Sequence, residues 1–160
     1  MANSHSYRHG PQIFIRPSAD SATVIERGDI CYLDTDDVKT PAQYTWATSD
    51  AATQAALANV FLGIADEAKA AGAAGLVNVD ISATSVYEFT CVATTWEVGT
   101  TFAIDGNGAD AMFDQVLEKT ATATAAIARA LDRATASSTK VHVSFASAYH
   151  TGSANSNAFV

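Results

Sequence analysis

The chain contains the stretch Glu26-Arg27-Gly28-Asp29-Ile30-Cys31-Tyr32-Leu33-Asp34, and its pattern returns at the same internal spacing in Glu97-Val98-Gly99-Thr100-Thr101-Phe102-Ala103-Ile104-Asp105. Each copy has a glutamate, a glycine two positions later, a β-prone run, and a final aliphatic residue followed by aspartate. Glycine suits a tight entry turn because it adopts positive φ at low cost, and the run after it is typical of a strand. The repeat therefore predicts two β-modules that begin alike.

A second element follows each copy in the same order. In the first copy, Ile64-Ala65 leads through a turn to the alternating residues Val77, Val79 and Ile81. In the second copy, Ile127-Ala128 leads through a similar turn to Val141, Val143 and Phe145. Alternation with period two marks a half-buried strand. We therefore predict pseudo-repeats over 26–81 and 97–145, within a single β domain that spans 26–146.

One short helix is expected between the strands. Thr48-Ser49-Asp50 offers an N-cap, and apolar residues follow at helical spacing, which predicts a helix near 51–60. The alanine-rich segment 121–134 also has helical propensity, which is a weak guide by itself. The repeat, however, aligns its Ile127-Ala128 with Ile64-Ala65, which stands just before a turn and a strand. We predict a strand over 125–132. The expected fold class is mainly β, a compact β-barrel or sandwich built from two similar β-modules.

Both ends of the chain differ in composition from its middle. Residues 1–25 predict an extended N-terminal arm, in which Ile13-Phe14-Ile15 forms a short β-prone run flanked by Pro11 and Pro17. Proline beside such a run favours an edge strand or an added strand. We expect Ile13, Phe14 and Ile15 to contact a partner, and residues 1–17 to be dispensable for folding. Residues 147–160 predict a polar C-terminal tail.

Composition narrows the function classes. The 160 residues suit one domain; 48% are apolar, but 33 are alanine, and only 16% are charged. A net charge of −8 and nine scattered basic residues argue against a nucleic-acid partner, which needs clustered Lys and Arg. The sequence shows neither an apolar run of about 18 residues nor a signal-peptide pattern, so we expect no membrane partner. Cys31 and Cys91 are expected to be free thiols.

Local motifs for catalysis or metal binding are missing from the sequence, which contains no G-x-S-x-G, H-E-x-x-H, C-x-x-C or phosphate-binding glycine loop. His5 and His9 suit a metal only in a helix, His142 alternates with Val141 and Val143 and should point outward, and His150 lies in the tail. The acidic runs Asp34–Asp37 and Asp105–Asp110 lack the spacing of a calcium loop and predict acidic turns. We expect no catalytic residue, cofactor or metal ligand; cation binding at Asp34–Asp37 stays open.

An ordered set of short motifs resembles the small head decoration, or cement, proteins of tailed bacteriophages and prophages. The likeness covers roughly 20–145 and comprises E-x-G-D-x-x-Y-L-D at 26–34, F-L-G-I-A at 61–65, V-x-E-F-x-C at 86–91, Glu97-Val98-Gly99, Phe113-Asp114-Gln115, Ala126-Ile127-Ala128-Arg129 and Val141-x-Val143. Ala128 departs from the glycine that related sequences tend to have before the second aliphatic strand.

The resemblance implies a structural role rather than chemistry. It implies a virion protein, made in the host bacterial cytoplasm, that binds the major capsid protein on the capsid surface, commonly as a homotrimer at three-fold positions. Such a protein needs a rigid β body and an arm that adds a strand to a neighbour's sheet. Two alternatives remain open at this point: another phage structural module, such as a tail or fibre component, and a small enzyme or ligand-binding domain whose groups converge without a local signature.

Overall fold

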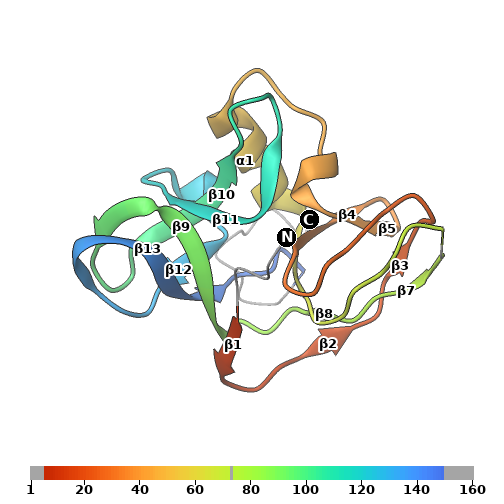
Figure 1. The fold of residues 1–160 in the computed structure, drawn as a ribbon, viewed down its shortest axis with the longest axis horizontal. Helices are drawn as coiled ribbons and strands as arrows, with labels where there is room; N and C mark the ends of the chain where they lie inside the picture. The colour runs from red at the N-terminus through yellow and green to blue at the C-terminus, as the bar shows by residue number, and fades with distance from the viewer. Residues whose placement is uncertain (1–5, 73, 150–160) are drawn as a thin grey trace.

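The computed structural model describes residues 6–72 and 74–149, and the fold is mainly β with one α-helix (Figure 1). The strands form two sheets, one of six strands and one of seven. Their bounds are β1 (Ser6–His9), β2 (Phe14–Ile15), β3 (Ser18–Ala19), β4 (Ile30–Asp34), β5 (Asp37–Lys39), β6 (Phe61–Ala65), β7 (Gly75–Leu76), β8 (Val79–Asp80), β9 (Val86–Trp96), β10 (Thr101–Gly106), β11 (Met112–Lys119), β12 (Ala128–Ala130) and β13 (Ala134–Phe145). The helix α1 spans Asp50–Val60, and two short 3₁₀ helices span Pro41–Gln43 and Ala123–Ala125.

The second half of the chain forms a closed β-barrel, called here the barrel. Its strands follow the order β9-β11-β10-β12-β13, and β13 pairs with β9 to close the ring. Four pairings are antiparallel, whereas β11 runs parallel to β9. Closure gives each of these five strands a neighbour on both sides. At the start of β9, β13 lies on one side and β1 on the other.

The first half forms the curled sheet, with the order β2-β8-β6-β4-β5-β3-β7. The connections between β2 and β3 and between β7 and β8 are only two residues long, so the two ends of the sheet lie close together. Every residue of β6, Phe61–Ala65, is buried. A continuous apolar run of this kind is typical of a strand that is covered on both faces.

The two units have the same connectivity, as the repeat predicted. β4 and β5 form an antiparallel hairpin, and so do β10 and β11. In both units the next strand, β6 or β12, pairs antiparallel with the first strand of the hairpin, and then with β8 or β13. The parallel pairing also recurs, β3 with β5 and β9 with β11. The fold therefore consists of two similar β-modules, and each also contains the strand that precedes its E-x-G turn.

The E-x-G turns themselves have equivalent geometry. Gly28 and Gly99 have φ of 95° and 85°. The N–H of Gly28 donates to the carbonyl of Ala65 at 2.7 Å, and that of Gly99 donates to Ala130 at 2.8 Å. Ala65 therefore corresponds to Ala130, whereas the sequence pattern had aligned it with Ala128. The match is corrected by two residues, because strand register follows the hydrogen-bonded partners rather than the Ile-Ala dipeptide.

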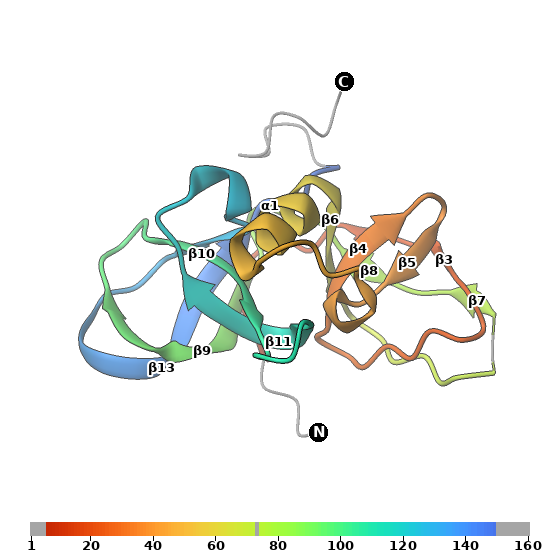
Figure 2. The same cartoon turned by 90° about the horizontal axis from the view of Figure 1, so that it is seen from above.

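The predicted helix and the predicted strand are both present. Ser49 caps α1, since its hydroxyl accepts from the N–H of Ala52 at 3.3 Å. Of the strand predicted over 125–132, only β12 (Ala128–Ala130) forms, and Ala125 ends a short 3₁₀ helix. Pairing with β10 and β13 overrides the α-helical propensity of the alanines in β12. Figure 2 shows α1 lying over the junction of the two units, between β10 and β4.

The main hydrophobic core crosses this junction. It joins residues of the curled sheet and α1 with residues of the barrel, among them Ile30, Leu57, Phe61, Phe89, Phe102, Leu117 and Phe145. A second cluster fills the interior of the curled sheet and includes Cys31, Val38, Leu62 and Val79. Cys31 and Cys91 are free and buried, as expected, one in each unit.

Both ends of the chain differ from the expectation. The N-terminal segment is extended, but it lies along its own chain: β1 pairs with β9, and β2 pairs with β8. Because β2 and β3 are strands of the curled sheet, a boundary at residue 25 does not separate an arm from the body. Ser147 and Ala148 are buried, so the packed chain extends past residue 146. Residues 150–160 lie outside the described part.

Candidate interaction surface

Of the three residues predicted to contact a partner, Phe14 and Ile15 form the edge strand β2, and Ile13 directly precedes it. Ile13 and Phe14 are 46% and 44% exposed, and Ile15 is half-buried against the core of the curled sheet. β2 ends the seven-stranded sheet, and among the described strands it pairs only with β8. The structure therefore brings the three residues together on a sheet edge, with two of the side chains in contact with solvent.

The backbone of β2 leaves hydrogen-bonding groups on its outer side. The carbonyl of Ile13 accepts from the N–H of Ile81 at 2.9 Å, which fixes the direction of the ladder toward β8. Successive residues of a strand direct their N–H and C=O groups to opposite sides. The N–H and C=O of Phe14 therefore point away from β8, toward the open edge. Such groups form a template for pairing with another strand.

A buried carboxylate holds the start of β2 in place. Asp80, which is 3% exposed, accepts from the N–H of Ile13 at 3.1 Å and from the N–H of Ser82 at 2.9 Å. Its other oxygen accepts from the hydroxyls of Ser85 and Tyr87, each at 2.7 Å. These four donors satisfy a charge whose burial would otherwise be costly. The edge strand is therefore fixed to both units, because Asp80 lies in β8 and Tyr87 in β9.

The phenol of Tyr87 stays protonated in this network. Burial raises its pKa above the ordinary value for tyrosine, and the hydrogen bond to Asp80 raises it further. The hydroxyl is therefore a permanent donor at neutral pH, and the group acts as a structural link rather than as an acid or base.

Two further carboxylates join the units at the E-x-G turn. Asp29, which is 4% exposed, accepts from the Gln115 side-chain amide and from the N–H of Glu26, each at 2.7 Å. Asp114 lies in β11 of the second module and accepts from the N–H of Ala42, in the first module, at 2.7 Å. Burial raises the pKa of Asp29 to about 6, and burial also raises the pKa of Asp114. These contacts tie the first module to the second and give the junction a sensitivity to pH.

The histidines do not form a site among the described residues. His9 lies in the strand β1, and His5 and His150 lie outside the described residues. His142 points outward from β13, and its side chain is 40% exposed between Asp132 at 2.7 Å and Glu88 at 3.5 Å. Burial opposes ionisation of Asp132, but hydrogen bonds from His142 and Trp96 outweigh it, and the net effect lowers the pKa of Asp132. The group is a hydrogen-bonded cluster at the surface.

The acidic runs are hairpin turns. Asp34 and Asp37 face each other where β4 meets β5, and Asp34 pairs with Lys39. Asp105 is the second-last residue of β10, and Asp110 lies in the turn to β11 with φ of 55°. Within 6–72 and 74–149, no three histidine, cysteine or acidic side chains lie together in a way that could hold a metal ion.

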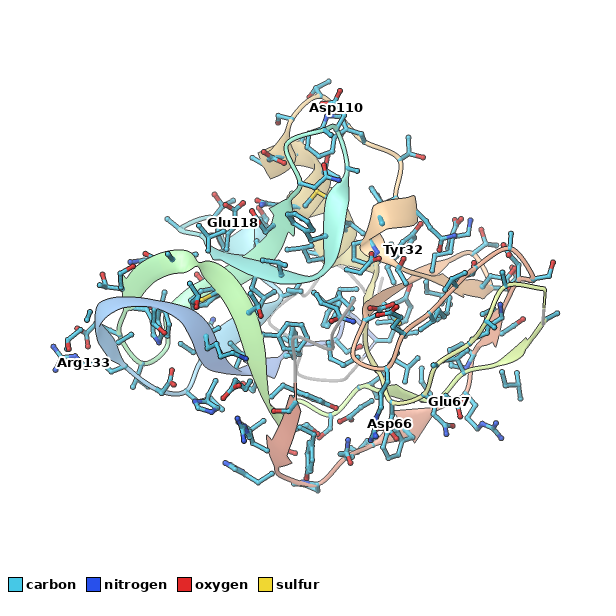
Figure 3. All side chains as sticks on the ribbon, in the orientation of Figure 1. Tyr32, Asp66, Glu67, Asp110, Glu118 and Arg133 are labelled. Atoms are coloured by element: carbon cyan, nitrogen blue, oxygen red, sulfur yellow. The ribbon has the colours of Figure 1, made fainter. Side chains whose placement is uncertain are left out.

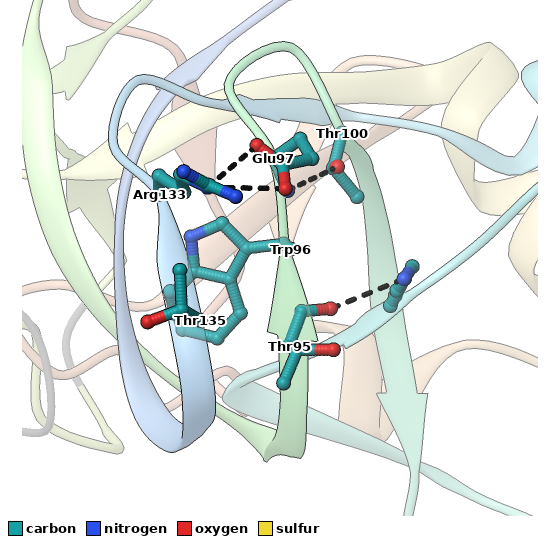
Figure 4. Close-up of a pocket in the computed structure, with 8 residues that line it drawn as sticks. Thr95, Trp96, Glu97, Thr100, Arg133 and Thr135 are labelled. Carbon is teal, nitrogen blue, oxygen red and sulfur yellow. Dashed lines mark hydrogen bonds and ion pairs between the residues drawn. The ribbon is translucent and has the colours of Figure 1, made fainter.

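A hollow of polar character lies at the end of the barrel. It has a volume of about 280 Å³ and is lined by residues that include Thr95, Glu97, Thr100, Lys119 and Arg133 (Figure 4). Its polar groups are largely paired with one another: Arg133 donates to Glu97 at 3.1 Å, and Lys119 donates to the carbonyl of Thr95 at 3.1 Å. The open shape and the internal pairing do not point to a particular ligand.

Comparison with models of known protein families and with curated proteins found no match for this chain. In the described part, no helix combines the length and the apolar character needed to cross a membrane.

Several features of this surface have no local sequence signal. The pairing of β1 with β9, the network at Asp80 and the contact of Asp29 with Gln115 join residues that are distant in the chain. One signal was available: Asp29 directly follows the first E-x-G motif, at the position where the second copy has Thr100. In both copies the side chain at this position accepts from the glutamate N–H, Glu26 at 2.7 Å and Glu97 at 3.1 Å.

Proposed function

We propose that this chain is a structural virion protein that binds the outer surface of a bacteriophage capsid and stabilises the shell. Its partner is the major capsid protein, and it acts as a homotrimer at three-fold positions of the capsid surface, after synthesis in the host bacterial cytoplasm. The resemblance to head decoration proteins gives the proposal its direction.

The open edge of β2 is the observation that carries the proposal. A protein that reinforces a shell needs a rigid body and a segment that bonds to its neighbour. Here Asp80 fixes the edge strand to both β-modules, and Phe14 on the strand and Ile13 directly before it remain exposed. Strand addition supplies main-chain hydrogen bonds as well as side-chain contacts. A force on the edge would thus be transmitted to the whole body.

A trimer suits a protein that binds many equivalent sites on a shell. One short strand buries little surface, so a single contact is weak. Three linked copies that bind adjacent capsid subunits raise the effective concentration of each contact and slow dissociation of the whole. A symmetric trimer also matches the rotational symmetry of a three-fold position.

Sedimentation with empty shells tests the proposal. Shells that lack the protein are mixed with it, pelleted, and then heated with and without it. We expect saturable binding in multiples of three, a trimer by native mass spectrometry, and a higher temperature of shell disruption. A protein that stays in the supernatant, or that pellets with tails instead of shells, would refute the proposal.

A further inference from the structure

The internal repeat makes β2 and the first half of β9 equivalent. Ile15 of β2 pairs with Val79, and Tyr87 of β9 pairs with Val143. Val79 and Val143 in turn pair with Ala65 and Ala130. The carbonyls of these two alanines accept the hydrogen bonds from the glycine N–H groups of the E-x-G turns. By the same register, Phe14 corresponds to Val86, and Arg16 corresponds to Glu88.

In the barrel, the outer side of this position is occupied by β1. Ser6 pairs with Glu88, and Tyr7 pairs with Tyr87. Arg8 of the same strand forms an ion pair with Glu88. With the strand in place, Val86 is 7% exposed and Tyr87 is 4% exposed.

In the curled sheet, the same position is open in the part of the chain that the structure describes. β2 has β8 on one side and no strand on the other. Phe14 is 44% exposed, although its counterpart Val86 is buried. Arg16 is exposed and makes no ion pair with any described residue. The charge at this position has the opposite sign in the two units: Arg16 stands in the curled sheet where the barrel has Glu88, and Glu88 pairs with Arg8.

We propose that the β2 edge binds an extended acidic segment of the shell protein, antiparallel to β2, with a carboxylate that reaches Arg16 as Arg8 reaches Glu88. This inference rests on the proposed function and specifies the partner of that site. The incoming strand bonds to the N–H and C=O of Phe14 and covers its side chain, just as β1 covers Val86.

Charge selects the shell protein over a second copy of this chain. Among the described residues, a second copy offers three sheet edges, β1, β2 and β7. β1 carries Arg8 and His9, and β2 is followed by Arg16, so either edge placed on β2 would bring two arginines together, and like charges across a strand pair are destabilising. β7 (Gly75–Leu76) has no charged residue, so it supplies no carboxylate for Arg16. An acidic segment gives the opposite sign and also explains why the position equivalent to Glu88 is basic.

Charge reversal at Arg16 tests the inference with the full-length protein and empty shells. We expect Arg16→Glu to weaken binding at least tenfold and Arg16→Gln to weaken it less. Raising the salt concentration should reduce the affinity of both variants less than it reduces the affinity of the parent protein. Arg133→Glu is the matched control, because Arg133 is an exposed arginine at the far end of the barrel (Figure 3). Circular dichroism shows whether each variant is folded.

A photo-cross-linking amino acid, p-benzoylphenylalanine, in place of Phe14 identifies the occupant. We expect cross-linked peptides from the shell protein that contain Asp or Glu. Cross-links to a second copy, to residues 150–160 of the same chain, or to a shell peptide without acidic residues would overturn the inference. So would binding by Arg16→Glu that equals that of the parent. In each of these cases the parent protein still binds shells, which separates this failure from failure of the proposed function.

Discussion

At the scale of single residues, Asp29 controls how the junction responds to pH. Its pKa is about 6 in the folded protein, against an ordinary value of 3.8, because burial disfavours the charged form. The folded state therefore holds a proton that the unfolded state has lost, and the free energy of unfolding falls as the pH rises from about 4 to above 6. A gap of about two pKa units corresponds to about 3 kcal/mol.

Replacing Asp29 by asparagine removes this dependence and retains the size of the side chain. We expect the unfolding free energy of Asp29→Asn to change less between pH 4 and 7 than that of the parent. The difference between the two curves should grow in favour of the variant as the pH rises. Urea unfolding at several pH values measures both curves, and the subtraction cancels the other titrating groups, such as Asp105, whose pKa burial also raises to about 6. Two parallel curves would contradict the assignment.

At the scale of elements, the N-terminal segment combines two roles that the sequence did not separate. β1 covers an edge of the barrel, whereas β2 belongs to the curled sheet. Between them, the carbonyl of Pro11 accepts from the hydroxyl of Ser82 at 2.6 Å, which fixes the crossing from one unit to the other. The expectation that residues 1–17 can be removed without unfolding is therefore revised.

Two truncations distinguish the roles of these strands. We expect the protein without residues 1–9 to remain folded, because the curled sheet and the closed barrel keep all of their own strands. The protein without residues 1–17 should lose protection around β8, because the N–H of Ile81 loses its acceptor, the carbonyl of Ile13. Hydrogen exchange at Ile81 measures this effect. Parent-like protection and melting in the longer truncation would show that β2 is dispensable.

At the scale of the whole molecule, the two β-modules are expected to unfold together. Their largest hydrophobic cluster contains residues of both units, and three carboxylates, the buried Asp29 and Asp80 and the half-buried Asp114, link the units by hydrogen bonds. Neither half can bury this surface alone. We expect one unfolding transition, with tryptophan fluorescence and far-ultraviolet circular dichroism changing together, and no stable fold for residues 82–149 produced alone. Two separated transitions, or a cooperative fold in that fragment, would show that the modules are independent domains.

The sequence by itself determined the features that repeat locally. The E-x-G motif predicted two equivalent turns with glycine at positive φ, Ser49 predicted the start of α1, and alternation predicted the strands around Val79 and Val143. The physical reason is that these signals depend on backbone conformation and on which side chains share one face of an element. For the same reason the sequence could place Ile13-Phe14-Ile15 on a short β-prone segment.

The tertiary structure alone decided which edges are paired. Closure of the barrel, the position of β1 beside β9 and the two-residue correction of the repeat all depend on contacts between distant parts of the chain. The sequence also could not show that Asp80 and Asp29 are buried, because a carboxylate in a polar stretch has the same pattern whether its donors come from water or from another strand. Register and edge exposure are set by long-range hydrogen bonds, and these exist only once the two modules have packed together.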